Sequence, residues 1–140
     1  MPPRNNQLSR GDPVKTSSHS HKDAAVEFLR LVGAGKVREA YDRHVAENFR
    51  HHNAYFRGDR ATLFKAMEDN ARNNPDKVVD VKHALEDGDT VAVHSHIRKG
   101  PQDRGAVAVH LFRFEDGRIA EFWDIGQQIE PDSPNENGMF

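Results

Sequence analysis

The spacing of the apolar residues changes near residue 78, and this change restricts the fold more than any other feature of the sequence. Before residue 78, apolar residues recur at the spacing of one helix face. After it, they alternate with polar residues, as on a half-buried strand. Helices followed by consecutive strands are typical of an α+β fold. A chain of 140 residues has the length of one such domain.

Three helices are predicted before this change. The first begins after Ser20, a candidate N-cap, and a Gly-Ala-Gly stretch separates it from the second. The third begins at the candidate N-cap Asp59 and ends at Asn74-Pro75, because the residue before a proline avoids helical geometry. The apolar positions of the three helices are Ala25, Phe28, Leu29 and Val32, then Val37, Ala40, Tyr41 and Val45, then Phe64, Met67 and Ala71.

Four strands are predicted after residue 78. The turns at Asp87-Gly88-Asp89 and Glu115–Arg118 each close a hairpin, and Arg98–Gly105 is predicted to be a loop. We therefore expect a long, curved antiparallel sheet. The predicted strands run from residue 78 to the first turn, and then over Thr90–Ile97, Ala106–Phe114 and Ile119–Ile125.

The last hairpin predicts that His110 and Asp124 share one face of the sheet. Its short turn pairs even-numbered positions, and one register places His110 opposite Asp124, whereas a shift by two residues makes them diagonal neighbours. The other face supports this parity, because Arg113 and Glu121 then form a favourable ion pair. In the first register, the neighbouring pairs are Phe112 with Phe122 and Phe114 with Ala120.

A carboxylate beside an imidazole, walled by Phe112, Phe114 and Phe122, is a place where pKa values shift. Apolar walls raise the pKa of an aspartic acid, an adjacent imidazolium lowers it, and the sequence leaves both outcomes open. In a functional interpretation, Asp124 is a general acid/base, and His110 orients it or stabilises an oxyanion. In the other interpretation, the pair is a structural hydrogen bond inside the sheet.

His94 and His96 are further candidates, because they lie on one face of their strand. If that strand pairs with the next, they share the concave surface with His110 and line the pocket. Together with His110 and Asp124 they also match the ligand types of a metal site, but ligand types alone do not fix a geometry, and we expect no metal.

The aromatic and His-rich segment Asn48–Gly58 lies between the second and third predicted helices and is expected to cover the pocket. Its polar side chains are candidates for hydrogen bonds to the substrate. The alternative is an ordinary loop in which Asn53 makes a side-chain turn. The complete set of predicted substrate-binding residues is His52, Asn53, Phe56, His94, His96, Phe112 and Phe122.

Several segments carry a resemblance to a known family: the helical opening, His52-Asn53 with Gly58, Val91–His96, His110–Gln127 and Asn135–Phe140. From about residue 22 to the end, the chain resembles the SnoaL-like polyketide cyclases of the nuclear-transport-factor-2-like superfamily. More closely, it resembles a bacterial branch described as predicted aldol-condensation enzymes. The strongest match is HLFRFEDGRIAEFWDIGQ, although this superfamily hosts many functions.

The resemblance implies a cone-shaped fold in which a curved sheet wraps three N-terminal helices around a pocket, and commonly a homodimer. It also implies that Asp124 acts as the acid/base and that His110 assists it. On the outer face of the predicted sheet, apolar residues suggest the dimer surface. They are Val107, Val109, Leu111 and Trp123.

Composition excludes several function classes. Twenty basic and 22 acidic residues argue against a nucleic-acid partner, and the lack of cysteine excludes disulfides, thiolate metal sites and cysteine nucleophiles. No stretch resembles a membrane span or a signal peptide, so we expect no membrane partner and a cytoplasmic protein. We expect a flexible N-terminal arm over residues 1–20, the domain over 21–128 and a C-terminal tail over 129–140, which ends in an apolar pair.

We therefore expect a cofactor-free acid/base enzyme that acts on a small to medium hydrophobic carbonyl compound by aldol-type cyclisation or isomerisation. One alternative is a non-catalytic ligand-binding or dimerisation module. Another is a related hydrolase or dehydratase. The epoxide-hydrolase form of this alternative needs an Asp-Arg-Asp set, for which Arg98 and Arg113 are candidates. The alternation of side chains along its strand places Arg113 on the face away from the pocket, which argues against it.

Overall fold

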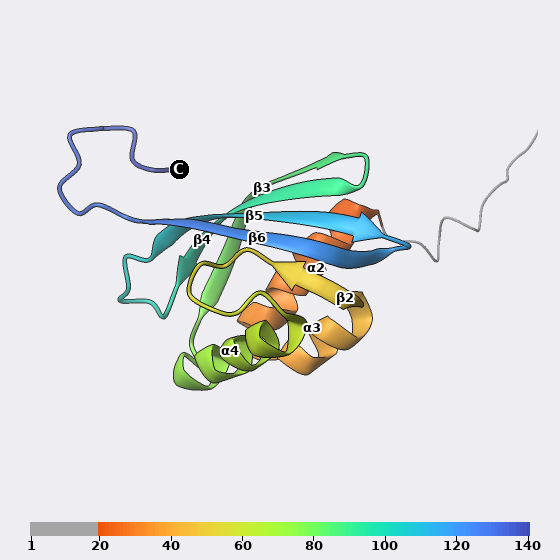
Figure 1. Ribbon diagram of the computed structural model, residues 1–140. Coiled ribbons are helices and arrows are strands. Elements are labelled where there is room, and N and C mark those ends of the chain that lie inside the picture. Colours follow the sequence, from red (N-terminus) through yellow and green to blue (C-terminus); the bar gives the residue numbers. More distant parts are fainter. Residues whose placement is uncertain (1–19) are drawn as a thin grey trace, which may run out of the picture.

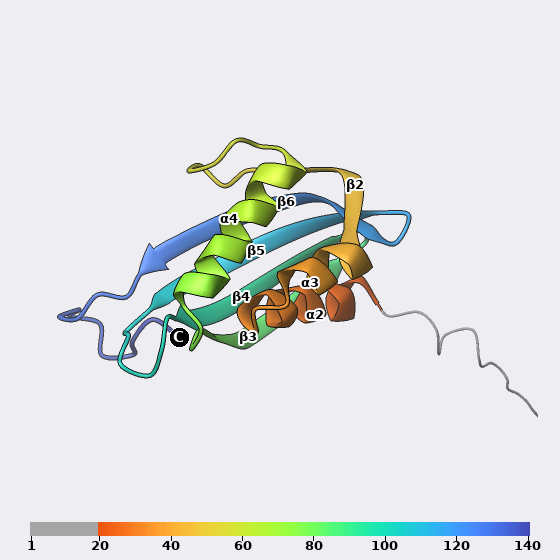
Figure 2. The same ribbon diagram turned by 90° about the horizontal axis from the view of Figure 1, so that it is seen from below.

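The computed structural model describes residues 20–140, in which three helices lie on one face of a curved, five-stranded sheet (Figure 1). Residues 1–19, which hold nearly all of the predicted N-terminal arm, lie outside the described part. Seen from below, α4 crosses the strands, and α2 and α3 lie beside it (Figure 2). The elements are α2 (His21–Gly33), α3 (Val37–His44), β2 (Val45–His51), α4 (Arg60–Asn73), β3 (Val78–Asp87), β4 (Thr90–Arg98), β5 (Ala106–Glu115) and β6 (Arg118–Gln128).

The helices begin at the predicted N-caps. The Ser20 side chain accepts a hydrogen bond from the Asp23 amide at 3.1 Å, and the Asp59 carboxylate accepts one from the Thr62 amide at 2.9 Å. Each bond satisfies an amide that has no partner within its helix. The apolar helix faces pack on the sheet, where the Phe28 ring contacts the rings of Phe112 and Phe122 at centroid distances of 6.0 and 6.1 Å.

The strand order is β2-β6-β5-β4-β3, and all pairings are antiparallel except that of β2 with β6, which is parallel. The sequence prediction missed β2, since it assigned Val45 to the second helix and the residues from Asn48 onward to a loop. The reason is that buried and exposed residues do not alternate regularly along β2. Its register shifts between Val45 and Arg50, and only Val45, Phe49 and His51 are buried. The α+β fold class is confirmed, but the sheet is mixed and open.

The predicted parity of the last hairpin is confirmed. His110 pairs with Asp124, Phe112 with Phe122, and Arg113 with Glu121 across β5 and β6. One predicted pair is wrong, because Phe114 lies opposite Ile119 instead of Ala120. A β-bulge between Arg113 and Phe114 shifts the register near the turn, and the alternation of apolar residues does not reveal such an extra residue.

The C-terminal tail returns over the face of the sheet that is opposite the helices (Figure 1). Its last residue, Phe140, lies against the rings of His94 and His96 at centroid distances of 5.6 and 4.7 Å. The apolar end of the chain therefore docks on the body of the same molecule. None of the helices described here has the length and apolar character needed to cross a membrane.

Candidate functional site

A cavity of about 340 Å³ lies between the helices and the inner face of the sheet. Its wall is mostly apolar and comes from α2, α4 and the strands β3 to β6. Such a volume lies at the lower end of the range of about 300–1,000 Å³ typical of small-molecule sites. The polar side chains on the wall are Asn53, Asn70, Lys77, His110 and Asp124.

Asp124 is held in this cavity by a hydrogen-bonding group on each carboxylate oxygen. His110 Nε2 lies 3.2 Å from Oδ1, and Asn53 Nδ2 donates to Oδ2 at 2.7 Å. The antiparallel pairing of β5 and β6 places His110 directly opposite Asp124. His110 is buried, whereas the Asp124 side chain is 30% exposed and so remains open to the cavity.

The environment determines the charge of Asp124. Burial raises the pKa of this carboxyl, but the hydrogen bond and charge of His110 and the hydrogen bond from Asn53 outweigh burial and hold the pKa below its usual value. Asp124 is therefore an ionised carboxylate at neutral pH. This resolves the two opposing effects that the sequence left open, and it makes Asp124 a base in the resting protein.

Asn53 is positioned by a tight loop at the end of β2. Its backbone amide donates to His51 Nδ1 at 3.1 Å, and its side-chain oxygen accepts from the Tyr55 amide at 2.9 Å. His51 Nε2 lies 2.6 Å from the carbonyl oxygen of Arg57 and donates to it, since a carbonyl can only accept. The predicted side-chain turn and the predicted pocket contact of Asn53 therefore both occur. The buried His51, which is absent from the predicted set, builds the loop that holds Asn53.

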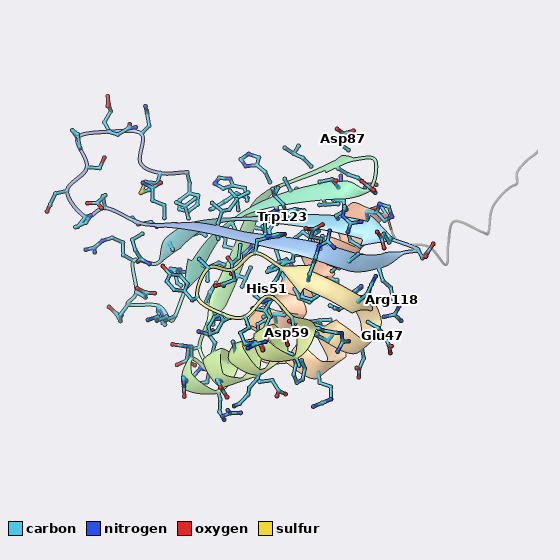
Figure 3. The ribbon with its side chains drawn as sticks, in the orientation of Figure 1. Glu47, His51, Asp59, Asp87, Arg118 and Trp123 are labelled. Carbon is cyan, nitrogen blue, oxygen red and sulfur yellow. The ribbon has the colours of Figure 1, made fainter. Side chains whose placement is uncertain are left out.

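His52 does not line the cavity, and that prediction is wrong. Its ring stacks on Trp123 at a centroid distance of 5.0 Å, and its Nε2 lies 2.6 Å from Glu121 on the outer face of β6. Neighbouring side chains of a strand point to opposite faces, so the inward direction of His51 turns His52 outward. Figure 3 shows His51 and Trp123 on opposite sides of the sheet.

His94 and His96 also lie on the outer face, contrary to prediction. In the register of β4 and β5, Val93 lies opposite His110, so His94 and His96 fall on the other side of the sheet. The length of the 99–105 loop does not predict whether even-numbered or odd-numbered residues of β4 share the face of His110. The arrangement of three histidines and Asp124 therefore does not form, and the described residues contain no cluster of three or more His, Cys, Asp or Glu that could hold a metal.

The predicted aromatic residues take three different positions. Phe122 lines the cavity beside Asp124, and Phe56 lines it from the covering loop, where it is 45% exposed. Phe112 is fully buried and supports the Phe122 ring from behind at a centroid distance of 5.3 Å. Phe112 is therefore a core residue below the site instead of a wall of the pocket.

The SnoaL-like domain model matches residues 25–122, which include both helices and strands of this site. The chain belongs to the SnoaL-like family. The resemblance found in the sequence is thus confirmed at the family level, whereas the narrower aldol-condensation branch stays a prediction. No curated protein matched this SnoaL-like chain.

Solved structures share the fold of this SnoaL-like protein at low sequence identity. IdmH from Streptomyces antibioticus, a proposed polyketide cyclase, is 21% identical with a TM-score of 0.65, covering 78% of this chain and 93% of that one. A nuclear-transport-factor-2-like protein of unknown function from Cytophaga hutchinsonii is 19% identical with a TM-score of 0.63, covering 79% and 92%. AclR from Streptomyces galilaeus, a proposed hydroxylase, is 22% identical with a TM-score of 0.64, covering 76% and 88%.

A larger surface groove of about 610 Å³ runs along α2 in this SnoaL-like protein. It includes Glu27, whose pKa is lowered because its carboxylate is already hydrogen-bonded to His44 at 2.6 Å. That pair stabilises the packing of α2 on α3. The smaller cavity is the more enclosed and the more apolar of the two, and Asp124 with its two partners lies on its wall, so this cavity is the candidate site.

Two polar residues of the cavity wall are absent from the predicted site. Lys77 directly precedes β3, and Asn70 lies on α4. A single lysine after an Asn-Asn-Pro-Asp stretch has no pattern that separates it from a solvent-exposed turn residue. Only the packing of α4 over the sheet brings these two side chains to the cavity of Asp124.

Proposed function

We propose that this SnoaL-like protein is a cofactor-free acid/base enzyme that removes a proton from a carbon next to a carbonyl group. The observation that carries the proposal is the ionised Asp124 carboxylate, which His110 and Asn53 hold at the wall of a largely apolar cavity. A carboxylate of this kind is a suitable general base once a substrate excludes water. Family membership supports a cyclase-type function.

In the proposed reaction, Asp124 takes the proton from the α-carbon, and the electron pair of the broken C–H bond forms an enolate. Protonation of Asp124 removes the negative charge that His110 Nε2 contacts at 3.2 Å. His110 can then stabilise the charge that develops on the enolate oxygen. The enolate attacks a second carbonyl in an aldol-type cyclisation, or it is protonated elsewhere in an isomerisation, and Asp124 returns its proton.

The dimensions of the cavity support a small to medium, largely hydrophobic carbonyl compound. Apolar side chains such as Leu29, Leu63 and Val79 line most of the wall, and Phe122 lies next to the reacting groups. An apolar wall strengthens the electrostatic interactions of Asp124 and His110 with a bound substrate.

No specific observation favours either of the two alternative functions. The epoxide-hydrolase form of the second alternative needs an Asp-Arg-Asp set, but the described residues of the cavity wall include no arginine and no carboxylate other than Asp124. Arg113 lies on the outer face, where it binds Glu121 and Glu115. A binding module would not depend on an ionised Asp124, so the test below separates that alternative as well.

The test is exchange of solvent deuterium into a panel of ketones and β-dicarbonyl compounds, followed by mass spectrometry. We expect exchange with the wild-type protein and none above background with Asp124→Asn. Asp116→Asn is the matched control, because it makes the same chemical change in the exposed β5–β6 turn. Exchange that survives in Asp124→Asn would exclude Asp124 as the base.

We also propose a homodimer that forms through the outer face of the sheet, and the cytoplasmic location stays a prediction. Half-buried apolar side chains on this face support the dimer, and Ile125 beside them is 53% exposed. Light scattering coupled to size-exclusion chromatography measures the mass directly. A single 15.9 kDa species at micromolar concentration would contradict the dimer.

A further inference from the structure

Lys77 brings an amine into the cavity from the side opposite Asp124. Asp124 lies on β6, whereas Lys77 precedes β3, which is the far edge strand of the sheet. The Lys77 ammonium or amine donates a hydrogen bond to the side-chain oxygen of Asn70 on α4. Both side chains line the cavity, so this bond holds the Lys77 nitrogen at the cavity wall.

The surroundings of Lys77 lower the pKa of its ammonium group. Burial lowers the pKa of Lys77, the nearby Asp124 carboxylate acts in the opposite direction, and Lys99 lowers the pKa further. The net effect places the pKa below its usual value. Lysines that act as nucleophiles owe their reactivity to the same two causes, which are an apolar pocket and a neighbouring cation.

We propose that Lys77 is a second reactive group of this site and condenses with the carbonyl of an aldehyde or ketone substrate to form an imine. This inference rests on the proposed removal of an α-proton by Asp124 and deepens it, with an enamine on Lys77 in place of the enolate. It assigns the substrate class to carbonyl compounds whose carbonyl carbon is open to an amine, and it assigns the activation of the carbonyl to Lys77. The geometric basis is that an oriented amine and an oriented carboxylate face the same cavity.

The steps balance without any further reagent. The Lys77 nitrogen attacks the carbonyl carbon, and the carbonyl oxygen takes one proton from that nitrogen and one from solvent and leaves as water, so that a protonated imine forms. Asp124 then removes the α-proton, and the electron pair of the C–H bond forms an enamine. The enamine attacks a second carbonyl, whose oxygen takes the proton held by Asp124, and this restores the protonated imine. Addition of water to the imine then releases the product, the free amine and the proton taken from solvent.

A different role for the same residue is a fixed ammonium that binds a carboxylate of the substrate. That role requires the charged form of Lys77 and makes no covalent bond. The two roles therefore differ in the reactivity of the nitrogen towards carbonyl compounds, and this reactivity is measurable without knowledge of the natural substrate.

The probe is 2,4-pentanedione, which reacts with neutral amines to give a stable enaminone that absorbs in the near ultraviolet. We expect the full-length protein to react first at Lys77, as located by peptide mass spectrometry. At neutral pH Lys77 should react faster than the exposed Lys65, because each unit by which burial lowers the Lys77 pKa raises its share of neutral amine about tenfold. Equal labelling of the exposed lysines, or slower labelling of Lys77, would overturn the proposal in favour of the fixed ammonium.

Three variants sharpen this measurement. Lys77→Met should remove the fast reaction, whereas Lys65→Met, the matched control on α4, should keep it. Asn70→Asp places a carboxylate beside the nitrogen with little change in shape, so it should raise the Lys77 pKa and slow the reaction. Fast labelling that persists in Lys77→Met would assign the reactivity to another lysine and contradict the inference.

The failure of this inference differs from the failure of the proposed function. Asp124→Asn removes a charge that favours the ammonium, so labelling of Lys77 should persist or become faster while deuterium exchange is lost. Absence of fast labelling together with Asp124-dependent exchange overturns only the role of Lys77. Fast labelling together with exchange that survives in Asp124→Asn overturns only the role of Asp124. Borohydride should also trap the exchanging ketones as secondary amines on Lys77, and failure to trap them would contradict the imine.

Discussion

Two carboxylates on β6 lie three residues apart and face opposite sides of the sheet. On the outer side, Glu121 contacts Arg50 at 3.1 Å, His52 at 2.6 Å and Arg113 at 3.1 Å. On the inner side, Asp124 contacts only His110 and Asn53, and it remains open to a cavity. The two ionised carboxylates therefore differ in their partners, since Glu121 is paired with two arginines and a histidine, whereas Asp124 has one histidine and one amide and still faces the cavity.

The two carboxylates also differ in how their pKa values arise. The hydrogen bond from Arg50 and that from His52 lower the Glu121 pKa from its usual value near 4.5 to about 2. At Asp124, burial raises the pKa, whereas His110 and Asn53 lower it, so the lowered pKa is the difference between opposing effects. A base must accept a proton during the reaction, and the two arginines beside Glu121 oppose this, whereas neither hydrogen-bonding partner described for Asp124 is an arginine.

The largest expected effect separates these two roles directly. Asp124→Asn should lower the deuterium exchange rate by about 100-fold to 10,000-fold, which is the usual contribution of a general base. Glu121→Gln should leave exchange within a few-fold of wild type, because Glu121 does not touch the cavity. The measurement is the initial exchange rate per folded protein. Equal losses in the two variants would abolish the distinction drawn above.

The next effect concerns the donor that the loop supplies to Asp124. Asn53→Ala removes one hydrogen bond to the carboxylate, so the Asp124 pKa should rise. The pH at which the exchange rate is half-maximal should then increase. The exchange rate at high pH, where Asp124 is ionised in both proteins, should fall less than the rate at low pH. The pH profile of the exchange rate checks this, and an unchanged midpoint would mean that Asn53 does not set the charge of Asp124.

A third effect concerns stability. Glu121→Gln should lower the free energy of unfolding by about 1–2 kcal/mol at pH 7, because charged donors lose an ionised partner. The folded pKa of Glu121 is depressed, so its contribution is present above pH 4.5 and is lost as the pH falls towards 2. Urea titrations at several pH values should show the wild type and the variant converging at acidic pH. A constant difference down to pH 2 would contradict the assignment.

The smallest expected effect lies in the tail. Phe140→Ala removes a half-exposed ring from His94 and His96 on the outer face, so the melting temperature should change little and deuterium exchange should not change. Thermal unfolding and the exchange assay check both statements. A marked loss of exchange would connect the outer face with the cavity and weaken the separation of the two faces.

Local patterns in the sequence predicted what depends on local geometry. The period of the apolar residues placed the three helices, and the short β5–β6 turn fixed the pairing of His110 with Asp124. The faces of His52, His94 and His96 depend instead on a parallel strand and on the exit of a long loop. A shift of the strand register by one residue at these places turns every side chain of the strand to the opposite face, and no local sequence pattern predicts that shift. Lys77 was missed because helix packing, and no motif, brings it to the cavity.

The loop between β2 and α4, which covers the cavity, is held together where it begins and ends. The His51 amide donates to the Gly58 carbonyl oxygen at 3.2 Å, and the backbones of Arg50 and Asp59 form an antiparallel β-bridge, so residues 52–57, which include Asn53, form a short loop on a fixed stem. Within this loop, the Phe56 side chain lines the cavity, whereas backbone atoms of Tyr55 and Arg57 hold Asn53 and His51 in place. A change of the Phe56 side chain can therefore alter which molecules enter the cavity while the backbone hydrogen bonds that position Asn53 remain.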